Sequence, residues 1–376
     1  MFKLTPPLGW NTWNTFGEKI NEQLILDAAD EMVRFGLKDC GYEYIVIDDC
    51  WAMKERDENG KLVADPAKFP NGMKALSDAI HAKGLKFGMY SCAGTLTCAG
   101  YPASYDYEFI DAATFAEWGV DFLKYDYCFH TPLIKAKYLY RRMGAALANC
   151  GREILFSACS WGIDETQKWI KTTGASMWRS TTDIFDSWSF IKKLTAQQKE
   201  LHPYNGVGCF NDMDMLVVGM GGRGNVGKES GCTFEEYRSH FSIWCMMGSP
   251  LMIGCDIRSM NEETGSILMN RDAIAIDQDP SCNQPYRITD CRYPDEDVLI
   301  YARLLTNGDY AIGVFNMGDA EHSADFLLDE IGLPISCGKT LLMRDVWSGK
   351  EEMPKNNTVS VRVKAHDCRL WRCKVV

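Results

Sequence analysis

Two aspartates are the residues of this chain best suited to catalysis, and the first is Asp126. In segment 121–128, Lys124 precedes Asp126 by two positions. Side chains two apart on a strand point to the same face, and a nearby ammonium group favours an ionised carboxylate. An ionised carboxylate suits a nucleophile, although a structural Lys–Asp pair explains the same two residues equally well.

Asp183 is the second candidate. In segment 178–184, Arg179, Thr181 and Asp183 alternate, so their side chains share one face of an extended strand. Two carboxylates flanking a glycosidic bond hydrolyse it with retention at a separation of ~5–5.5 Å and with inversion at ~6.5–9.5 Å. A solvated acid at a strand end explains Asp183 equally well when this segment is taken alone.

Further polar and aromatic residues fit sugar binding, each with an alternative. Asp48 and Asp49 could bind sugar hydroxyls or a divalent metal, and hydroxyl binding is favoured because no histidine lies nearby. Asp212 and Asp214 leave both alternatives open. Trp13 could stack on a sugar ring, but core packing is the commoner role of such a tryptophan.

Eight short β-rich segments must position these side chains. Helical patterns that end at glycine, such as 22–36 and 70–84, separate the segments. This alternation predicts parallel strands with crossover helices, and eight units favour a closed (β/α)8 TIM barrel. The segments are 8–14, 42–51, 85–92, 120–128, 154–161, 176–184, 206–216 and 250–257.

Polar side chains gather at the C-terminal end of nearly every predicted strand. Barrel enzymes build their active sites at that end from several strands at once, whereas solvated charges would be scattered over the helices. We therefore expect one shared site. The polar side chains are those of Asp48, Asp49, Tyr90, Lys124, Asp126, Ser160, Arg179, Asp183, Asp212, Asp214 and Asp256.

The pattern changes after Pro280 to short strands separated by turn residues, with no long helical pattern. This predicts a C-terminal antiparallel β-sandwich domain. We expect a catalytic barrel over residues 1–280 and the β-domain over 281–376. The predicted strands of the β-domain are 298–304, 310–315, 341–346, 359–363 and 368–375.

The formal net charge of −11 argues against nucleic acid or an anionic membrane surface as a partner. It fits a neutral substrate, although a solvated acidic surface explains it better. No apolar run approaches the ~18 residues of a membrane span. Residues 1–7 contain no hydrophobic signal region, which points to a cytoplasmic protein.

Two other patterns have structural explanations. The sixteen cysteines include no C-x-x-C pair and no zinc-site spacing, so most are expected to be free, buried thiols. Residues 219–224 match G-x-G-x-x-G, and 222–228 resemble a phosphate-binding loop. Both lack the context that nucleotide binding requires, so a glycine-rich surface loop is the better interpretation.

Several motifs, in one collinear order from about residue 5 to 280, together resemble glycoside hydrolase family 27. That family contains α-galactosidases and α-N-acetylgalactosaminidases. The resemblance implies a barrel followed by an antiparallel β-domain. The motifs are Leu8-Gly9-Trp10-Asn11-Thr12-Trp13, Asp48-Asp49-Cys50-Trp51, Thr97-Cys98-Ala99-Gly100, Lys124-Tyr125-Asp126, Trp178-Arg179 to Asp183, and Asp214-Met215-Leu216.

The resemblance also implies roles by position. Asp126 matches the nucleophile and Asp183 the acid/base of a retaining, exo-acting hydrolase that needs no metal or cofactor. Cys98 and Cys128 match a disulfide beside the active site; Cys50 lacks its usual family partner, so no second bridge is expected. The implied substrate-binding residues are Trp13, Asp48, Asp49, Tyr90, Lys124, Cys159, Ser160, Trp161, Arg179, Asp214 and Met215.

The residues near the sugar 2-position give conflicting indications. Ser160 resembles the serine of N-acetylgalactosaminidases, which leaves room for an acetamido group. Gly162 and Ile163 instead resemble the shorter loop of plant and fungal galactosidases, in which tryptophan closes the pocket. We expect the substrate to be an oligosaccharide or glycoconjugate with terminal α-linked galactose, and α-N-acetylgalactosaminide is the alternative.

Two alternatives come from other functional classes. One is a metal-dependent barrel enzyme that uses Asp48, Asp49, Asp212 and Asp214 as ligands, and the other is a non-catalytic sugar-binding protein. No nucleic-acid or membrane partner is expected, and homo-oligomerisation is left open.

Overall fold

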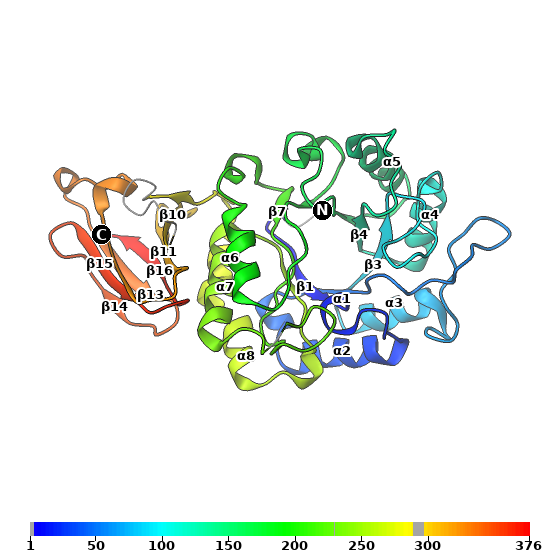
Figure 1. Cartoon of the computed structure of the whole chain (residues 1–376), viewed down its shortest axis with the longest axis horizontal. Helices are drawn as coiled ribbons and strands as arrows, with labels where there is room; N and C mark the ends of the chain where they lie inside the picture. The colour runs from blue at the N-terminus through cyan, green and yellow to red at the C-terminus, as the bar shows by residue number, and fades with distance from the viewer. Residues whose placement is uncertain (1–3, 229, 289–296) are drawn as a thin grey trace.

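A computed structural model describes residues 4–228, 230–288 and 297–376 of the chain. Its larger part is a parallel barrel, ordered β7-β6-β5-β4-β3-β2-β1-β8 (Figure 1). Leu216 closes the ring because its N–H donates to the Met252 carbonyl (2.7 Å) and its carbonyl accepts from the Gly254 N–H (2.9 Å). The strands are β1 (Leu8–Asn11), β2 (Tyr44–Val46), β3 (Lys86–Cys92), β4 (Phe122–Asp126), β5 (Leu155–Ala158), β6 (Met177–Arg179), β7 (Phe210–Asp212) and β8 (Leu251–Ile253).

Each barrel strand lies inside the segment predicted for it, so the TIM-barrel prediction is confirmed. Local chemistry fixes several helix ends. The Asn21 side chain caps α2 by accepting the Leu24 N–H (2.9 Å), and α4 ends at Gly119, whose φ is 80°. The helices are α1 (Trp13–Phe16), α2 (Glu22–Arg34), α3 (Gly72–Ala82), α4 (Glu108–Trp118), α5 (Ala136–Ala148), α6 (Trp188–Ala196), α7 (Phe234–Met247), α8 (Glu262–Leu268) and α9 (Arg271–Asp277).

The predicted β-sandwich is also confirmed. A sheet of order β14-β13-β16-β11-β10-β9 faces the two-stranded sheet β12-β15, and all strand pairs are antiparallel. Side chains such as Phe326 on β12 and Trp371 on β16 share the core between the sheets. The strands are β9 (Tyr286–Arg287), β10 (Val298–Leu304), β11 (Tyr310–Asn316), β12 (His322–Leu327), β13 (Leu341–Asp345), β14 (Glu351–Glu352), β15 (Thr358–Val363) and β16 (Cys368–Val375).

The β-domain packs against the barrel on the side of α6 and α7 (Figure 1). Leu299, Phe315 and Leu370 of the β-domain belong to the same apolar core as Trp244 of α7. The contact also has polar ties, because Arg238 of α7 forms an ion pair with Asp367 at 2.6 Å. The two domains therefore share buried surface rather than only a linker.

The glycine-rich residues 219–228 form a loop that binds a carboxylate of its own chain. The N–H of Gly222 donates to Asp186 Oδ2 (2.7 Å), and the N–H of Cys232 donates to Asp186 Oδ1 (3.3 Å). The Tyr237 hydroxyl also contacts this fully buried aspartate. The glycine pattern therefore serves a structural purpose. Within the ranges described above, no helix is long and apolar enough to cross a lipid bilayer.

Candidate active site

The C-terminal ends of the barrel strands meet at one cavity, as expected from the polar residues there. Both candidate carboxylates, Asp126 and Asp183, line it. Asp126 is the last residue of β4, and Asp183 lies in the loop after β6. The lining residues are Trp13, Asn14, Asp48, Asp49, Tyr90, Cys98, Lys124, Asp126, Trp161, Arg179, Asp183, Ile184, Asp214, Met215 and Val226.

Asp126 is buried, with a side chain held by two donors. The Tyr90 hydroxyl donates to Oδ2 (3.1 Å), and the Tyr127 N–H donates to Oδ1 (3.2 Å). Burial raises the pKa of Asp126 to about 6; Lys124 opposes this shift, and the charge of Asp183 adds to it. The carboxylate is therefore ionised at neutral pH but poorly solvated, which favours nucleophilic attack.

Lys124 faces the cavity, but its ion-pair partner is Asp48 rather than Asp126. Its Nζ lies 2.7 Å from Asp48 Oδ2, an oxygen that also accepts from Asn11 Nδ2 at 2.8 Å. Burial disfavours the ammonium charge, but Asp48 and Asp126 outweigh it and raise the pKa of Lys124. The structural Lys–Asp pair considered for residues 124 and 126 therefore does not form.

Asp49 is oriented by main-chain donors. Its Oδ1 accepts the Cys50 N–H (2.7 Å), and its Oδ2 accepts the N–H of Ala99 in the loop after β3 (2.9 Å). Burial raises the pKa of Asp49. These contacts fix the carboxylate at the cavity wall, where its oxygens can also accept hydrogen bonds from sugar hydroxyls.

Arg179 at the end of β6 holds two acids of the site. Its Nη2 donates to Asp183 Oδ1 (2.9 Å) and forms a short ion pair with Asp214 Oδ2. Its Nε donates to Thr181 Oγ1 (3.1 Å), so Arg179 contacts both residues that were expected beside it. The extended strand predicted through residue 184 ends at Arg179, however, and the contacts are made within the loop that follows. Asp183 has a side chain 62% exposed, unlike Asp126, so it can exchange protons with a leaving group and with water.

Cys98 and Cys128 form a disulfide beside the nucleophile candidate, as the resemblance implied. It is the only disulfide within the described ranges, where thirteen other cysteines are free. Cys98 Sγ lies 3.5 Å from Asp126 Oδ2 and 3.3 Å from the Tyr90 hydroxyl. The bridge thus joins the loops after β3 and β4 directly at the site.

Two predicted substrate-binding residues lie outside the cavity lining. Ser160 is fully buried and its hydroxyl bonds to Thr166 Oγ1 (2.6 Å), while Cys159 lies in the barrel interior below Arg179. Trp161 lines the cavity instead, with a left-handed φ of 53°. The wall near Arg179 is therefore built by Trp161 and not by Ser160.

Asp212 and Asp256 also lie apart from the cavity lining. Asp256 caps a short 3-10 helix and forms an ion pair with Arg258 (2.8 Å), and Asp212 accepts the Asp214 N–H (2.8 Å) from below the site.

Sequence reasoning missed Asn14, Ile184 and Val226 in the lining. Asn14 and Ile184 adjoin motifs that were recognised, and Val226 has no sequence signal.

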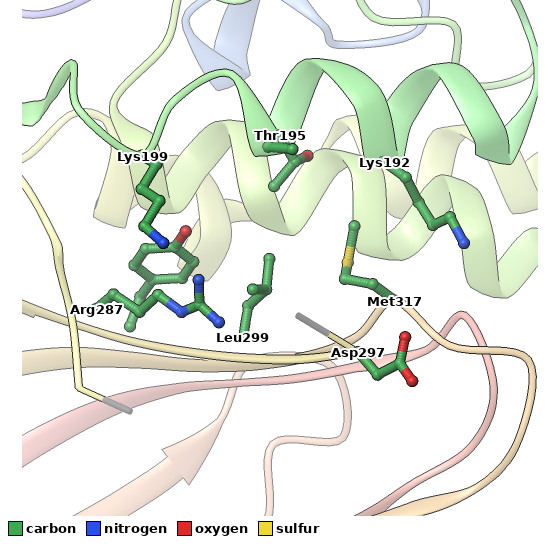
Figure 2. Close-up of a pocket in the computed structure, with 9 residues that line it drawn as sticks. Lys192, Thr195, Lys199, Arg287, Asp297, Leu299 and Met317 are labelled. Atoms are coloured by element: carbon green, nitrogen blue, oxygen red, sulfur yellow. The ribbon is translucent and has the colours of Figure 1, made fainter. Parts of the chain in front are cut away.

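A larger cavity of about 190 Å³ lies between α6 and the β-domain (Figure 2). Lys192 of α6, Lys199 just after it and Arg287 of β9 line it, and Asp297 is the one carboxylate among the described residues of the lining. Paired carboxylates, which glycoside hydrolysis requires, occur in the smaller cavity at the barrel mouth. The barrel cavity is therefore the candidate active site despite its size.

Comparison with known proteins identifies the family. Residues 5–279 match the family model described as "Alpha galactosidase A", and residues 295–373 match that of the "Alpha galactosidase C-terminal beta sandwich domain". An α-galactosidase of Cyamopsis tetragonoloba is 41% identical over 98% of this chain and 85% of its own.

Solved structures agree with these matches. α-Galactosidase I of Mortierella vinacea has a TM-score of 0.90 and 37% identity over 99% of this chain and 97% of its own. The α-galactosidase of Saccharomyces cerevisiae with raffinose has a TM-score of 0.89 and 30% identity over 100% and 98%. The chain belongs to glycoside hydrolase family 27, the family of these α-galactosidases.

Proposed function

We propose that this protein is an exo-acting, retaining α-galactosidase in which Asp126 is the nucleophile and Asp183 the acid/base. We assign these roles from a single observation, the difference in solvent exposure between the two carboxylates of one cavity. Asp126 is buried between fixed donors, whereas Asp183 is solvent-exposed and held by Arg179. Full-length α-galactosidase relatives support the activity.

The reaction has two displacement steps. Asp126 attacks the anomeric carbon from the β face while Asp183 protonates the leaving oxygen, which gives a β-galactosyl enzyme and free aglycone. Asp183 then takes a proton from water, and the resulting hydroxide equivalent displaces Asp126. The product keeps the α configuration. By the family resemblance, Asp48 and Asp49 bind the 4- and 6-hydroxyls, and Arg179 and Asp214 lie near the 2- and 3-hydroxyls.

The geometry near Arg179 favours galactose over N-acetylgalactosamine. The turn that carries Trp161 packs on β6 and the residue after it, since the Gly162 N–H donates to the Arg179 carbonyl (3.1 Å) and a Cβ at Gly162 would meet the Ser180 carbonyl at 2.8 Å. This packing fixes the backbone beside Trp161, which lines the cavity. By the family resemblance this segment surrounds the sugar 2-position, so we infer that the indole takes up room that a 2-acetamido group would need. Ser160, which suggested the alternative, is bonded to Thr166 and does not line the cavity.

Parallel assays of an aryl α-galactoside and the matching α-N-acetylgalactosaminide test this specificity. The galactoside should have the higher kcat/KM. Trp161→Ala should reduce the ratio of the kcat/KM for the galactoside to that for the N-acetylgalactosaminide. Faster turnover of the N-acetylated substrate would contradict the proposal. An Ile163→Ala variant is the control because Ile163 is exposed and lies outside the cavity lining.

The metal-dependent alternative fits the geometry less well. Two of its four carboxylates are neutralised by protein cations, Asp48 by Lys124 and Asp214 by Arg179. If a metal were nevertheless required, dialysis against EDTA would abolish turnover; unchanged kcat is expected.

A further inference from the structure

We propose that Cys98 and Cys128, once their disulfide is reduced, form with Asp126 a site for a soft divalent metal ion such as Zn²⁺. The bound ion would occupy the nucleophile and switch off hydrolysis, so this regulation rests on the proposed function of Asp126.

The geometry of three ligand atoms carries the proposal. One ligand atom from each of Cys98, Asp126 and Cys128 lies within 4.8 Å of the others. Two thiolates and a carboxylate, completed by water, match a tetrahedral zinc site with one open position. Thiolates select soft metals over the Mg²⁺ and Ca²⁺ that bind to carboxylates alone.

The site has access and the freedom to adjust. Cys98 is exposed and lines the active-site cavity, so an ion in solution can reach its sulfur. Zn–S bonds of ~2.3 Å place two tetrahedral sulfurs roughly 3.7 Å apart, so the sulfurs must separate after reduction. The cysteines lie in different loops with Cα atoms 5.1 Å apart, and rotation of the exposed Cys98 side chain supplies the movement.

The charge of the cavity also favours a cation. Among the described residues, five carboxylates and two cationic side chains line it. The cations are already paired, Lys124 with Asp48 and Arg179 with Asp183 and Asp214. A metal ion beside Asp126 therefore enters a region of negative potential.

The metal site forms in two steps, reduction of the disulfide and then binding of the metal ion. A dithiol reductant transfers two electrons to the disulfide and becomes a cyclic disulfide itself, which leaves two cysteine thiols. The metal ion then displaces one proton from each thiol and binds both thiolates. Reoxidation after removal of the metal restores the bridge and the free carboxylate.

Cadmium serves as the probe because its thiolate complexes absorb in the ultraviolet. One sample of the enzyme is kept oxidised. A second is reduced by dithiothreitol and then desalted without oxygen. Both are titrated with Cd²⁺ while absorbance and aryl α-galactoside turnover are followed. The reduced enzyme should bind one more Cd²⁺ per chain than the oxidised enzyme. At free Cd²⁺ tenfold above Kd, the rate should fall roughly tenfold, and EDTA should restore it.

Variants separate this site from other thiols. Cys98→Ser should abolish the added absorption, and Asp126→Asn should weaken Cd²⁺ binding in an assay that needs no turnover. Cys337→Ser is the matched control, since Cys337 is exposed on the β-domain; it should retain both effects. If Cys98→Ser does not fold, the comparison of oxidised and reduced enzyme still decides.

Equal inhibition of oxidised and reduced enzyme, or thiolate absorption without inhibition, would overturn the metal switch. The proposed function is tested separately, because an oxidised enzyme that does not hydrolyse α-galactosides would contradict it whatever the cadmium titration shows.

Discussion

Asp126 combines burial with three kinds of stabilising contact: the Tyr90 hydroxyl, the Tyr127 N–H and the field of Lys124. Burial destabilises the ionised carboxylate, and these groups offset only part of that effect, so its pKa stays raised. A nucleophile needs this balance, because a fully stabilised carboxylate would attack slowly. Two measurements follow from it.

The first measurement is the pH dependence of kcat/KM. Asp126 must be ionised to attack, and its pKa is raised to about 6, so kcat/KM should fall as pH drops through about 6. A Lys124→Met variant removes a charge that lowers this pKa, so the acidic limb should move to higher pH. A limb that stays below about pH 4.5, near an unshifted carboxyl, would contradict this account.

The second measurement is the stability of Asp126→Asn. The pKa of Asp126 is about 6 in the folded protein against an ordinary value of 3.8, so the ionised form destabilises the fold above pH 6. The variant should be inactive but about 1–3 kcal/mol more stable at pH 8. This gain should shrink as pH falls from 6 and vanish below 3.8, where both folded and unfolded wild type are protonated. Chemical denaturation across pH measures it.

At the scale of single residues, part of the site could be predicted from the sequence. The alternation of Arg179, Thr181 and Asp183 predicted that these side chains lie together, and Arg179 contacts both of the others. The contacts are made in a loop rather than on a strand face, because β6 ends at Arg179. The partner of Lys124 was not predictable, because Asp48 follows another strand, β2, and lies 76 residues away in the chain. Ser160 was predicted to be a pocket residue, but its hydroxyl bonds to Thr166. The backbone at Trp161 is left-handed, and the indole forms the pocket wall instead.

The loops after β3 and β4 are the elements that hold the nucleophile in place. Gly94 allows their close approach, since a Cβ there would lie 2.0 Å from the Cys128 carbonyl oxygen. The Ala93 N–H donates to the Asp126 carbonyl (2.9 Å), and the Thr95 N–H donates to the Phe129 carbonyl (3.3 Å). The pairing of these loops therefore sets the position of Asp126 and of the disulfide.

Gly94→Ala tests this contact. It should push the two loops apart, lower the unfolding free energy by about 1–3 kcal/mol and lower kcat/KM for the aryl galactoside. Gly206→Ala is the control, because a Cβ there meets only the flexible end of Lys171 at 3.9 Å. If both variants have wild-type stability and activity, the loop contact does not matter.

Element prediction succeeded where the pattern was strong. The barrel strands are buried runs at regular spacing, so all eight were found. β12 was missed because only Ala324 and Phe326 are buried within it, between polar residues. Among the described strands, β15 alone pairs with it. The two-residue strands β9 and β14 are too short to give a pattern.

At the scale of the whole molecule, a buried contact joins the barrel and the β-domain. Arg303 of β10 is fully buried and donates to the carbonyls of Cys245 (3.1 Å) and Met246 (3.4 Å) at the end of α7. They are among the last carbonyls of the helix, for which the helix itself supplies no hydrogen-bond donor. We propose that residue 280 divides two domains that unfold together.

Arg303→Met tests this dependence. The variant leaves carbonyls at the end of α7 without this donor, so we expect about 1–3 kcal/mol lower stability in a single thermal transition. Arg362→Met on β15, where Arg362 is exposed, is the control and should unfold like the wild type. Two separate transitions in the wild-type protein would show that the domains are independent.

The residue roles are tested most directly by azide rescue of Asp126→Gly. The variant is incubated with an activated aryl α-galactoside and azide, and the product anomer is determined by NMR. Azide should enter the space of the missing carboxylate on the β face, so the account predicts slow formation of β-galactosyl azide. α-Galactosyl azide as the product would contradict it, because that anomer arises when azide replaces the acid/base rather than the nucleophile.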